Sequence, residues 1–139
     1  MPDIRLFGAT GYTGRLTALA LARRSASFAI SGRSRAKLDA VARECGDPEV
    51  RLASVGDTGS LVSALDGTKV LLTCVGPFER LGHTAVEAAL EAKVHYIDST
   101  GEGTSRARAR RRAREGARRA SDPAVEPMKP TDDQSRATV

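Results

Sequence analysis

The chain has 139 residues, 40% of them hydrophobic and 28% charged, which is enough for one globular domain with a core. No apolar run approaches the ~20 residues that a membrane helix needs, and the start has no secretory leader, so we expect a soluble, cytoplasmic protein. The net charge of +5 comes from the end of the chain: residues 1–104 hold 12 basic and 12 acidic side chains, and residues 105–139 hold 10 and 5.

Segments typical of strands alternate with segments typical of helices over the first 100 residues. This alternation is typical of right-handed βαβ crossovers. It predicts an α/β fold, a Rossmann-like doubly wound parallel sheet of five strands in the order 3-2-1-4-5, which binds ligands beyond the carboxyl ends of its strands. The predicted strands are 4–7, 28–31, 50–55, 69–75 and 94–97, and the predicted helices are 14–24, 34–44, 58–65 and 80–92.

A glycine-rich turn joins the first predicted strand to the first predicted helix. Backbone N–H groups at such a turn point at a phosphate, and the helix dipole favours the negative charge. Gly8 lets the chain leave the strand, Gly11 lets the backbone approach a pyrophosphate, and Gly14 lets the helix pack against the sheet. The turn therefore predicts a dinucleotide site, the alternative being a turn without a ligand. Its residues are Gly8, Ala9, Thr10, Gly11, Tyr12, Thr13 and Gly14.

The end of the second predicted strand indicates which dinucleotide binds. NAD-binding chains usually carry an acidic residue there, which accepts a hydrogen bond from the ribose 2′-hydroxyl. This chain has Arg33 and Ser34 instead, with Lys37 close by. A guanidinium beside a hydroxyl suits a 2′-phosphate, because its planar fork binds phosphate oxygens in pairs. We therefore expect NADP(H) as the cofactor; the alternative is that these are solvated charges opening a surface helix.

Four further candidate residues lie at or just after the carboxyl ends of the third and fourth predicted strands. Asp57 accepts from the adenine amino group in one interpretation and only caps the next helix in the other, and both stay open. Val75, Gly76 and Pro77 end the central strand where the strand order reverses. We expect these three to contact the nicotinamide side of the cofactor, against the alternative of an ordinary strand exit.

No constellation for catalysis is visible, and the catalytic residues stay unknown. Neither Tyr12 nor Tyr96 is followed by a lysine at the spacing that short-chain dehydrogenases use. Cys45 and Cys74 are interpreted as small buried residues in a reducing compartment, with a redox pair or a nucleophile as the alternative. No metal-ligand spacing occurs in the sequence.

Four stretches of the sequence resemble, in order, the NADP-binding domain of saccharopine dehydrogenase-like proteins, and most of all the trans-acting enoyl reductase subgroup. They are GATGYTGRLTA at 8–18, SGRSRAKL at 31–38, VGPF at 75–78 and YIDSTGE at 96–102. The resemblance implies an oxidoreductase family with a Rossmann domain that binds NADP(H). In complete members it implies a second domain that holds the substrate, a small molecule or an acyl group.

The sequence departs from the family pattern after Glu102. We expect an NADP-binding domain over 1–104, an arginine-rich helix over 105–120 and a disordered tail over 121–139. Such a chain is expected to be the cofactor-binding part of an oxidoreductase without its substrate domain, a truncated or frame-shifted product. The alternative is a non-catalytic NADP(H)-binding module or sensor, or a degenerate fragment.

Partners other than the dinucleotide are predicted from the tail and from the sheet edge. The arginine-rich segment has no aromatic side chains, so nucleic acid is not the expected partner, and no membrane segment is expected. A missing sixth strand leaves the edge beside the fifth strand uncovered, which predicts a homo-oligomer or aggregation through that edge.

Overall fold

The computed structural model describes residues 1–76 and 78–99 of the chain. Strands and helices alternate along these residues, which confirms the α/β prediction. The segments 105–120 and 121–139, with their predicted helix and predicted disorder, lie outside the described residues. In chain order the elements are β1 (Ile4–Phe7), α1 (Tyr12–Arg23), β2 (Phe28–Gly32), α2 (Arg35–Glu44), β3 (Glu49–Leu52), α3 (Thr58–Ala64), β4 (Val70–Thr73), α4 (Phe78–Glu91) and β5 (His95–Asp98).

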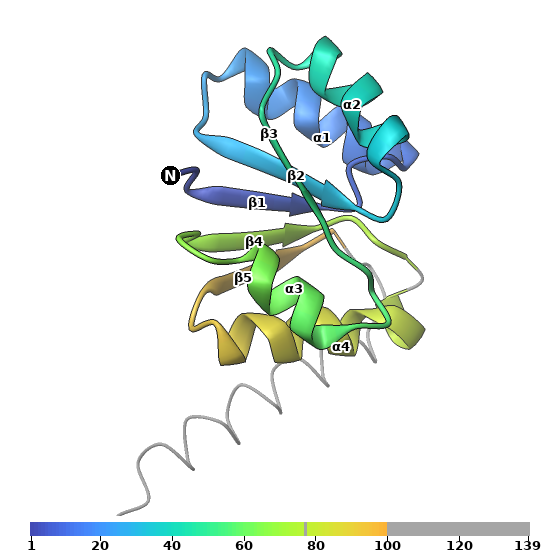
Figure 1. Cartoon of the computed structure of the whole chain (residues 1–139), viewed down its shortest axis with the longest axis vertical. Coiled ribbons are helices and arrows are strands. Elements are labelled where there is room, and N and C mark those ends of the chain that lie inside the picture. The colour runs from blue at the N-terminus through green and yellow to red at the C-terminus, as the bar shows by residue number, and fades with distance from the viewer. Residues whose placement is uncertain (77, 100–139) are drawn as a thin grey trace, which may run out of the picture.

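The five strands form one parallel sheet in the predicted order β3-β2-β1-β4-β5. Helices α1 and α2 cover one face, and α3 and α4 cover the other (Figure 1). The chain runs from β1 outward to β3, then returns through α3 to β4 on the other side of β1. The strand order therefore reverses between β1 and β4, and their carboxyl ends lie at the same edge of the sheet.

Two hydrophobic clusters hold the helices onto the sheet. Successive side chains of a strand point to opposite faces, so Leu6 enters the cluster under α1 and α2, and Phe7 enters the cluster under α3 and α4. In β4, Leu71 belongs to the second cluster and Leu72 packs against the first. This confirms that the apolar run of β4 reflects burial on both faces, as expected in a parallel sheet.

Helix caps set the boundaries of two elements near the cleft. Helix α1 begins at Tyr12, two residues before its predicted start, because Gly11 is extended at the N-cap position. Strand β3 pairs with β2 only over Glu49–Leu52, and the chain then turns to Asp57, which caps α3. The predicted strand over 50–55 is therefore too long at its carboxyl end.

Arg5 is buried in the middle of the sheet with a side chain that is only 1% exposed. It projects across the small Ala29 of β2 toward Glu49 of β3, whose carboxylate lies 3.8 Å from the guanidinium. None of its three guanidinium nitrogens has a hydrogen-bond partner among the described residues. Burial, and then the charge of Arg51, lower the pKa of Arg5 to about 10, although Glu49 partly opposes this.

Replacing Arg5 with methionine is expected to raise the free energy of unfolding by about 1–2 kcal/mol at pH 7. The lowered pKa of about 10 corresponds to a folded-state penalty of roughly 3 kcal/mol for the cation, because a tenfold change in proton affinity is worth about 1.4 kcal/mol. The penalty is constant below that pH and fades as the pH rises above it, because the folded state then releases its proton before the unfolded state. Urea unfolding measures the change.

Arg51→Met is the matched control for this substitution. The Arg51 guanidinium donates to the carbonyl of Asp66 at 3.1 Å, just after α3, so its loss is expected to destabilise the fold. A loss of about 3–5 kcal/mol in Arg5→Met itself would contradict the prediction, because that is the effect of breaking a buried ion pair.

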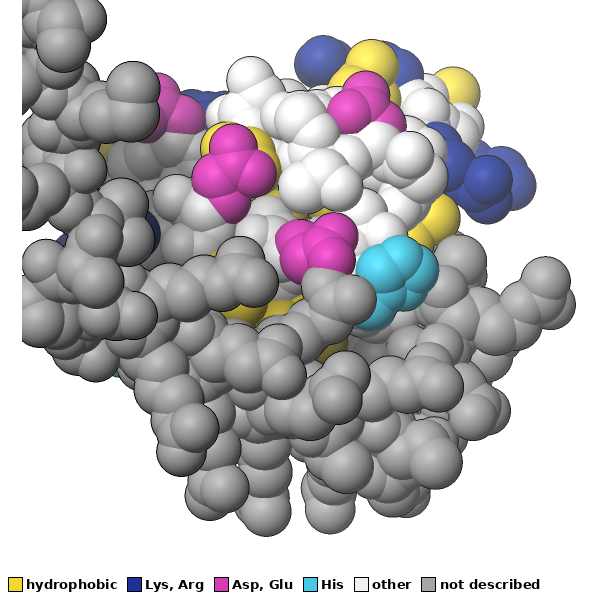
Figure 2. Space-filling view, turned by 90° about the horizontal axis from the view of Figure 1, so that it is seen from below, with side chains coloured by type: hydrophobic (Ala, Val, Ile, Leu, Met, Phe, Trp, Pro, Cys, Tyr) yellow, Lys and Arg dark blue, Asp and Glu magenta, His cyan; other side chains and the backbone are white. Residues whose placement is uncertain are grey.

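Two features of the described residues bear on a membrane or a nucleic acid as partner. Within the described residues, no helix is long and apolar enough to cross a membrane. Seen from below the sheet, the described surface carries acidic side chains and a histidine among uncharged groups, with basic side chains at its border (Figure 2). This part of the surface is therefore not a continuous basic face of the kind that binds nucleic acid.

Candidate functional site

A cleft of about 400 Å³ opens at the carboxyl ends of the strands, beside the point where the strand order reverses. Ligands of doubly wound sheets bind at this position. It brings together six of the predicted cofactor-binding residues: Gly8, Thr10, Gly11, Arg33, Val75 and Gly76. The other described residues of the lining are Phe7, Gly32, Val55 and Cys74.

The glycine turn needs two of its glycines for the fold itself. Gly8 has a φ of +84°, and a Cβ there would lie 2.6 Å from Cγ2 of Val75. A Cβ on Gly14 would lie 1.9 Å from the carbonyl oxygen of Gly8, which is backbone and cannot move aside alone. The first turn of α1 is thus pressed directly onto the end of β1.

Gly11 differs from the other two, because the fold leaves room at its position. A Cβ there would meet only the Gly8 carbonyl oxygen, at 3.7 Å, and its φ of −78° suits any residue. Gly11 nevertheless lines the cleft, where a side chain would stand between the backbone and a ligand. Its position fits the predicted role of close approach to a pyrophosphate.

The amino end of α1 has free hydrogen-bonding capacity toward the cleft. Gly11 is the N-cap residue and has no side chain to cap α1, and the first turn has no acidic residue. The first N–H groups of a helix have no partner within the helix, so they are suited to an anion. Ala9 is buried under this turn, while Tyr12 and Thr13 begin the helix on the outside and do not line the cleft.

The predicted phosphate-binding side chains lie at the start of α2. Ser34 caps the helix and its hydroxyl oxygen accepts from the backbone N–H of Lys37 at 3.4 Å, which leaves its own proton free to donate. Arg35 is paired with Asp39 at 2.9 Å. Within the described residues Arg33 and Lys37 have no ion pair, and Arg33 reaches the cleft.

Comparison with known proteins assigns this arrangement to a family. Residues 4–128 match the family described as the saccharopine dehydrogenase NADP-binding domain. The chain belongs to this family. Its cofactor is therefore NADP(H), as the arginine and serine after β2 predicted.

Two curated relatives are similar to this chain over part of their length. The trans-acting enoyl reductase of Mycobacterium ulcerans is 38% identical over 106 residues, which cover 72% of this chain and 25% of the relative. The corresponding protein of Mycobacterium leprae matches to the same extent. The chain thus spans about a quarter of the length of the curated relatives it matches.

Two solved structures share the fold of this domain. Saccharopine dehydrogenase (L-Glu forming) from Saccharomyces cerevisiae superposes with a TM-score of 0.65 at 18% identity, over 76% of this chain and 23% of that chain. An NADPH-dependent quinone oxidoreductase from Escherichia coli superposes with a TM-score of 0.60 at 24% identity, over 81% of this chain and 43% of that chain. At these identities the likeness concerns the fold alone.

The described residues fit the family's cofactor on two observations. The turn over residues 8–14 presents bare backbone to the cleft at Gly11, where a Cβ would meet only the Gly8 carbonyl oxygen, at 3.7 Å. Arg33, Ser34 and Lys37 bring a hydroxyl proton and two cations, which have no ion pair within the described residues, to the start of one helix; such donors suit a phosphate monoester.

The other described residues that the sequence predicted do not line the cleft; they are Ala9, Tyr12, Thr13, Gly14, Ser34, Lys37 and Asp57. The carboxylate of Asp57 caps α3 by accepting from the N–H of Ser60 at 3.1 Å, and Asp57 does not line the cleft. Its capping interpretation is therefore observed, while its contact with adenine stays a prediction. Pro77 lies outside the described residues.

Four lining residues were not predicted from the sequence. Phe7 and Gly32 are the last residues of β1 and β2, Cys74 follows β4 directly, and Val55 comes three residues after β3. Their common signal is their place at the carboxyl ends of strands, where any residue can reach the cleft. Their residue types carry no phosphate-binding chemistry, so composition alone did not single them out.

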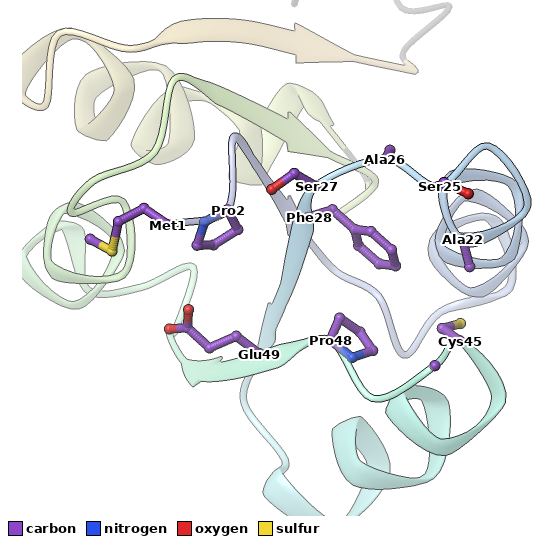
Figure 3. Close-up of a pocket in the computed structure, with 11 residues that line it drawn as sticks. Met1, Pro2, Ala22, Ser25, Ala26, Ser27, Phe28, Cys45, Pro48 and Glu49 are labelled. Atoms are coloured by element: carbon purple, nitrogen blue, oxygen red, sulfur yellow. The ribbon is translucent and has the colours of Figure 1, made fainter.

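A second cleft of about 430 Å³ lies at the opposite edge of the sheet, near the amino ends of β2 and β3. Phe28, Cys45 and Pro48 lie on one side of β2, and Met1 and Glu49 on the other (Figure 3). Doubly wound sheets do not bind dinucleotides at this edge. The second cleft is therefore not the NADP(H) site.

Proposed function

We propose that the cleft at the carboxyl ends of β1, β2 and β4 holds NADP(H) along its whole length. The glycine turn over residues 8–14 receives the pyrophosphate, and Arg33, Ser34 and Lys37 bind the 2′-phosphate. The wall formed by Val75 and Gly76, with Pro77, faces the nicotinamide side, and Asp57 the adenine. The observation that carries the proposal is that Gly11, Arg33 and Val75, far apart in sequence, line one cleft.

We further propose that the domain serves an NADP(H)-dependent reductase. When bound, the cofactor supplies the hydride, and the chain's part is to orient it and to keep its nicotinamide end open to a substrate. The relatives named as enoyl reductases suggest an unsaturated acyl group as that substrate. In this proposal, the substrate of those relatives is held by the three quarters of their length that this chain does not match.

A second candidate function is an NADP(H)-binding module without turnover of its own. In the described part of the cleft lining, Arg33 is the one charged side chain, and no acid–base pair is present there. Oxidation of NADPH with a 2-enoyl thioester, followed at 340 nm, separates the two candidates. Turnover by this chain supports the reductase, and binding without turnover supports the module.

Retention on immobilised 2′,5′-ADP tests the proposed binding mode. We expect the chain to be retained on this resin and released by NADPH, because the resin presents the 2′-phosphate that Arg33, Ser34 and Lys37 bind. The matched control is immobilised 5′-AMP, which lacks that phosphate and is expected to retain the chain poorly. Equal retention on the two resins, or none on either, contradicts the assignment.

Self-association through β5 is a further proposal for this chain. Within the described residues β5 is the last strand on its side of the sheet, and Ile97 in it is half-exposed. An edge strand with an exposed apolar side chain is a template for pairing with another chain. Light scattering is expected to show dimers or larger species that Ile97→Lys reduces, and a monomer in the unmodified chain at high concentration counts against it.

A further inference from the structure

Two hydrogen bonds through the Thr17 hydroxyl connect the two walls of the NADP(H) cleft. The hydroxyl of Thr17, in the second turn of α1, lies 2.8 Å from the carbonyl oxygen of Thr13, in the first turn. The same hydroxyl lies 3.7 Å from the sulfur of Cys74, the residue after β4. The contact spans 57 positions of sequence and joins α1 to the exit of β4.

The direction of these two hydrogen bonds follows from the number of protons available. A hydroxyl has one proton, and the Thr13 carbonyl can only accept. Thr17 therefore donates to Thr13, and the Cys74 thiol donates to Thr17. The thiol is held against α1, and it lies on the cleft wall beside Val75 and Gly76.

The residues at the two ends of this hydrogen-bonded series, Cys74 and Thr13, are each fixed to a part of the cleft. The backbone N–H of Cys74 donates to the carbonyl of Phe7 at 2.9 Å, which ties the exit of β4 to the end of β1. Thr13 belongs to the turn that begins α1 directly after Gly11, where no side-chain cap holds the helix. The bond from Thr17 is thus a side-chain tie between this uncapped turn and the opposite wall.

We infer that Thr17 and Cys74 are positioning residues that set the spacing between the pyrophosphate-binding turn and the Val75–Gly76 wall. The inference rests on the proposed function of the cleft. Thr17 does not line the cleft, so it acts through Thr13 and Cys74 rather than by touching the dinucleotide. A change at this tie acts on the part of the cofactor that NADPH and NADH share.

Thr17→Val removes the hydroxyl and keeps the shape, so it is the test. We expect it to weaken NADPH and NADH binding by the same factor, about threefold to tenfold, which is what one neutral hydrogen bond is worth. Thr17→Ser, which keeps the hydroxyl, is expected to restore the affinity. Cys74→Ala combined with Thr17→Val is expected to lose no more than Thr17→Val alone, because the two groups act as one unit.

A spectroscopic readout separates positioning from a general loss of structure. In a Cys45→Ala background, Cys74 is the single thiol, and its S–H stretching band in the Raman spectrum is expected to shift in Thr17→Val. The free energy of unfolding should fall by no more than about 1.5 kcal/mol, the contribution of one neutral hydrogen bond, so the chain stays folded. An unshifted band, or unmodified affinity for both dinucleotides in Thr17→Val, overturns the inference; failure of the unmodified chain to bind either dinucleotide overturns the proposed function instead.

Discussion

Replacing Arg33 with alanine is expected to weaken NADPH binding by about tenfold to a hundredfold and to leave NADH binding almost unchanged. Hydrogen bonds to a charged group contribute about 1.5–3 kcal/mol each, and only NADPH carries the 2′-phosphate that receives them. Within the described residues Arg33 has no ion pair, so the substitution breaks no ion pair there. Competitive titration of both dinucleotides measures the effect.

Arg35→Ala is the matched control for this prediction. It removes the same charge two residues further along, but the Arg35 guanidinium is already engaged by Asp39 at 2.9 Å and does not line the cleft. We expect it to change NADPH affinity by less than about threefold, as for a screened surface charge. If both dinucleotides lose affinity equally in Arg33→Ala, or if Arg35→Ala matches its effect, the 2′-phosphate is bound elsewhere.

Gly14→Ala is expected to destabilise the chain by roughly 3 kcal/mol or more. The added Cβ would lie 1.9 Å from the Gly8 carbonyl oxygen and 2.7 Å from its carbonyl carbon, so α1 must move away from the end of β1. Because the whole cleft floor depends on this contact, we expect dinucleotide binding to be lost together with stability. Urea unfolding and dinucleotide titration, run on the same sample, measure the two losses.

Gly11→Ala is the comparison that separates folding from binding. Its Cβ would lie 3.7 Å from the Gly8 carbonyl oxygen, an ordinary contact, and the residue already has an ordinary φ. Alanine is a poorer N-cap than glycine but restricts the unfolded chain more, so we expect the free energy of unfolding to change by less than about 1 kcal/mol. The methyl group projects where the turn receives the pyrophosphate, and binding of both dinucleotides should fall by tenfold or more. Normal stability in Gly14→Ala, or normal binding in Gly11→Ala, would show that these two glycines have been given the wrong roles.

The fold and six residues of the cleft lining were predictable from local patterns. Strand order follows from alternating β and α segments, and the glycine turn and Arg33 lie at strand ends that such a sheet gathers at one edge. Ser34 begins the predicted helix over 34–44, and the structure shows its hydroxyl oxygen accepting from the helix backbone, as a serine at a helix start does.

The unpredicted features depend on contacts between distant residues. Nothing local to Thr17 indicates that Cys74 lies beside it, and Cys74 alone reads as a small buried residue. Arg5 reads as an interruption of an apolar strand, and its burial depends on the small Ala29 beside it and on Glu49 beyond. Such pairings exist only after the strands have taken their order and register.

Calorimetric titration of the unmodified chain with NADPH and with NADH tests most directly whether one dinucleotide spans the glycine turn and Arg33. We predict one NADPH bound per chain, about tenfold to a hundredfold more tightly than NADH, because the two share the pyrophosphate contacts and differ only at the 2′-phosphate. Equal affinity for the two dinucleotides, or no binding of either by the folded chain, would contradict the proposed site.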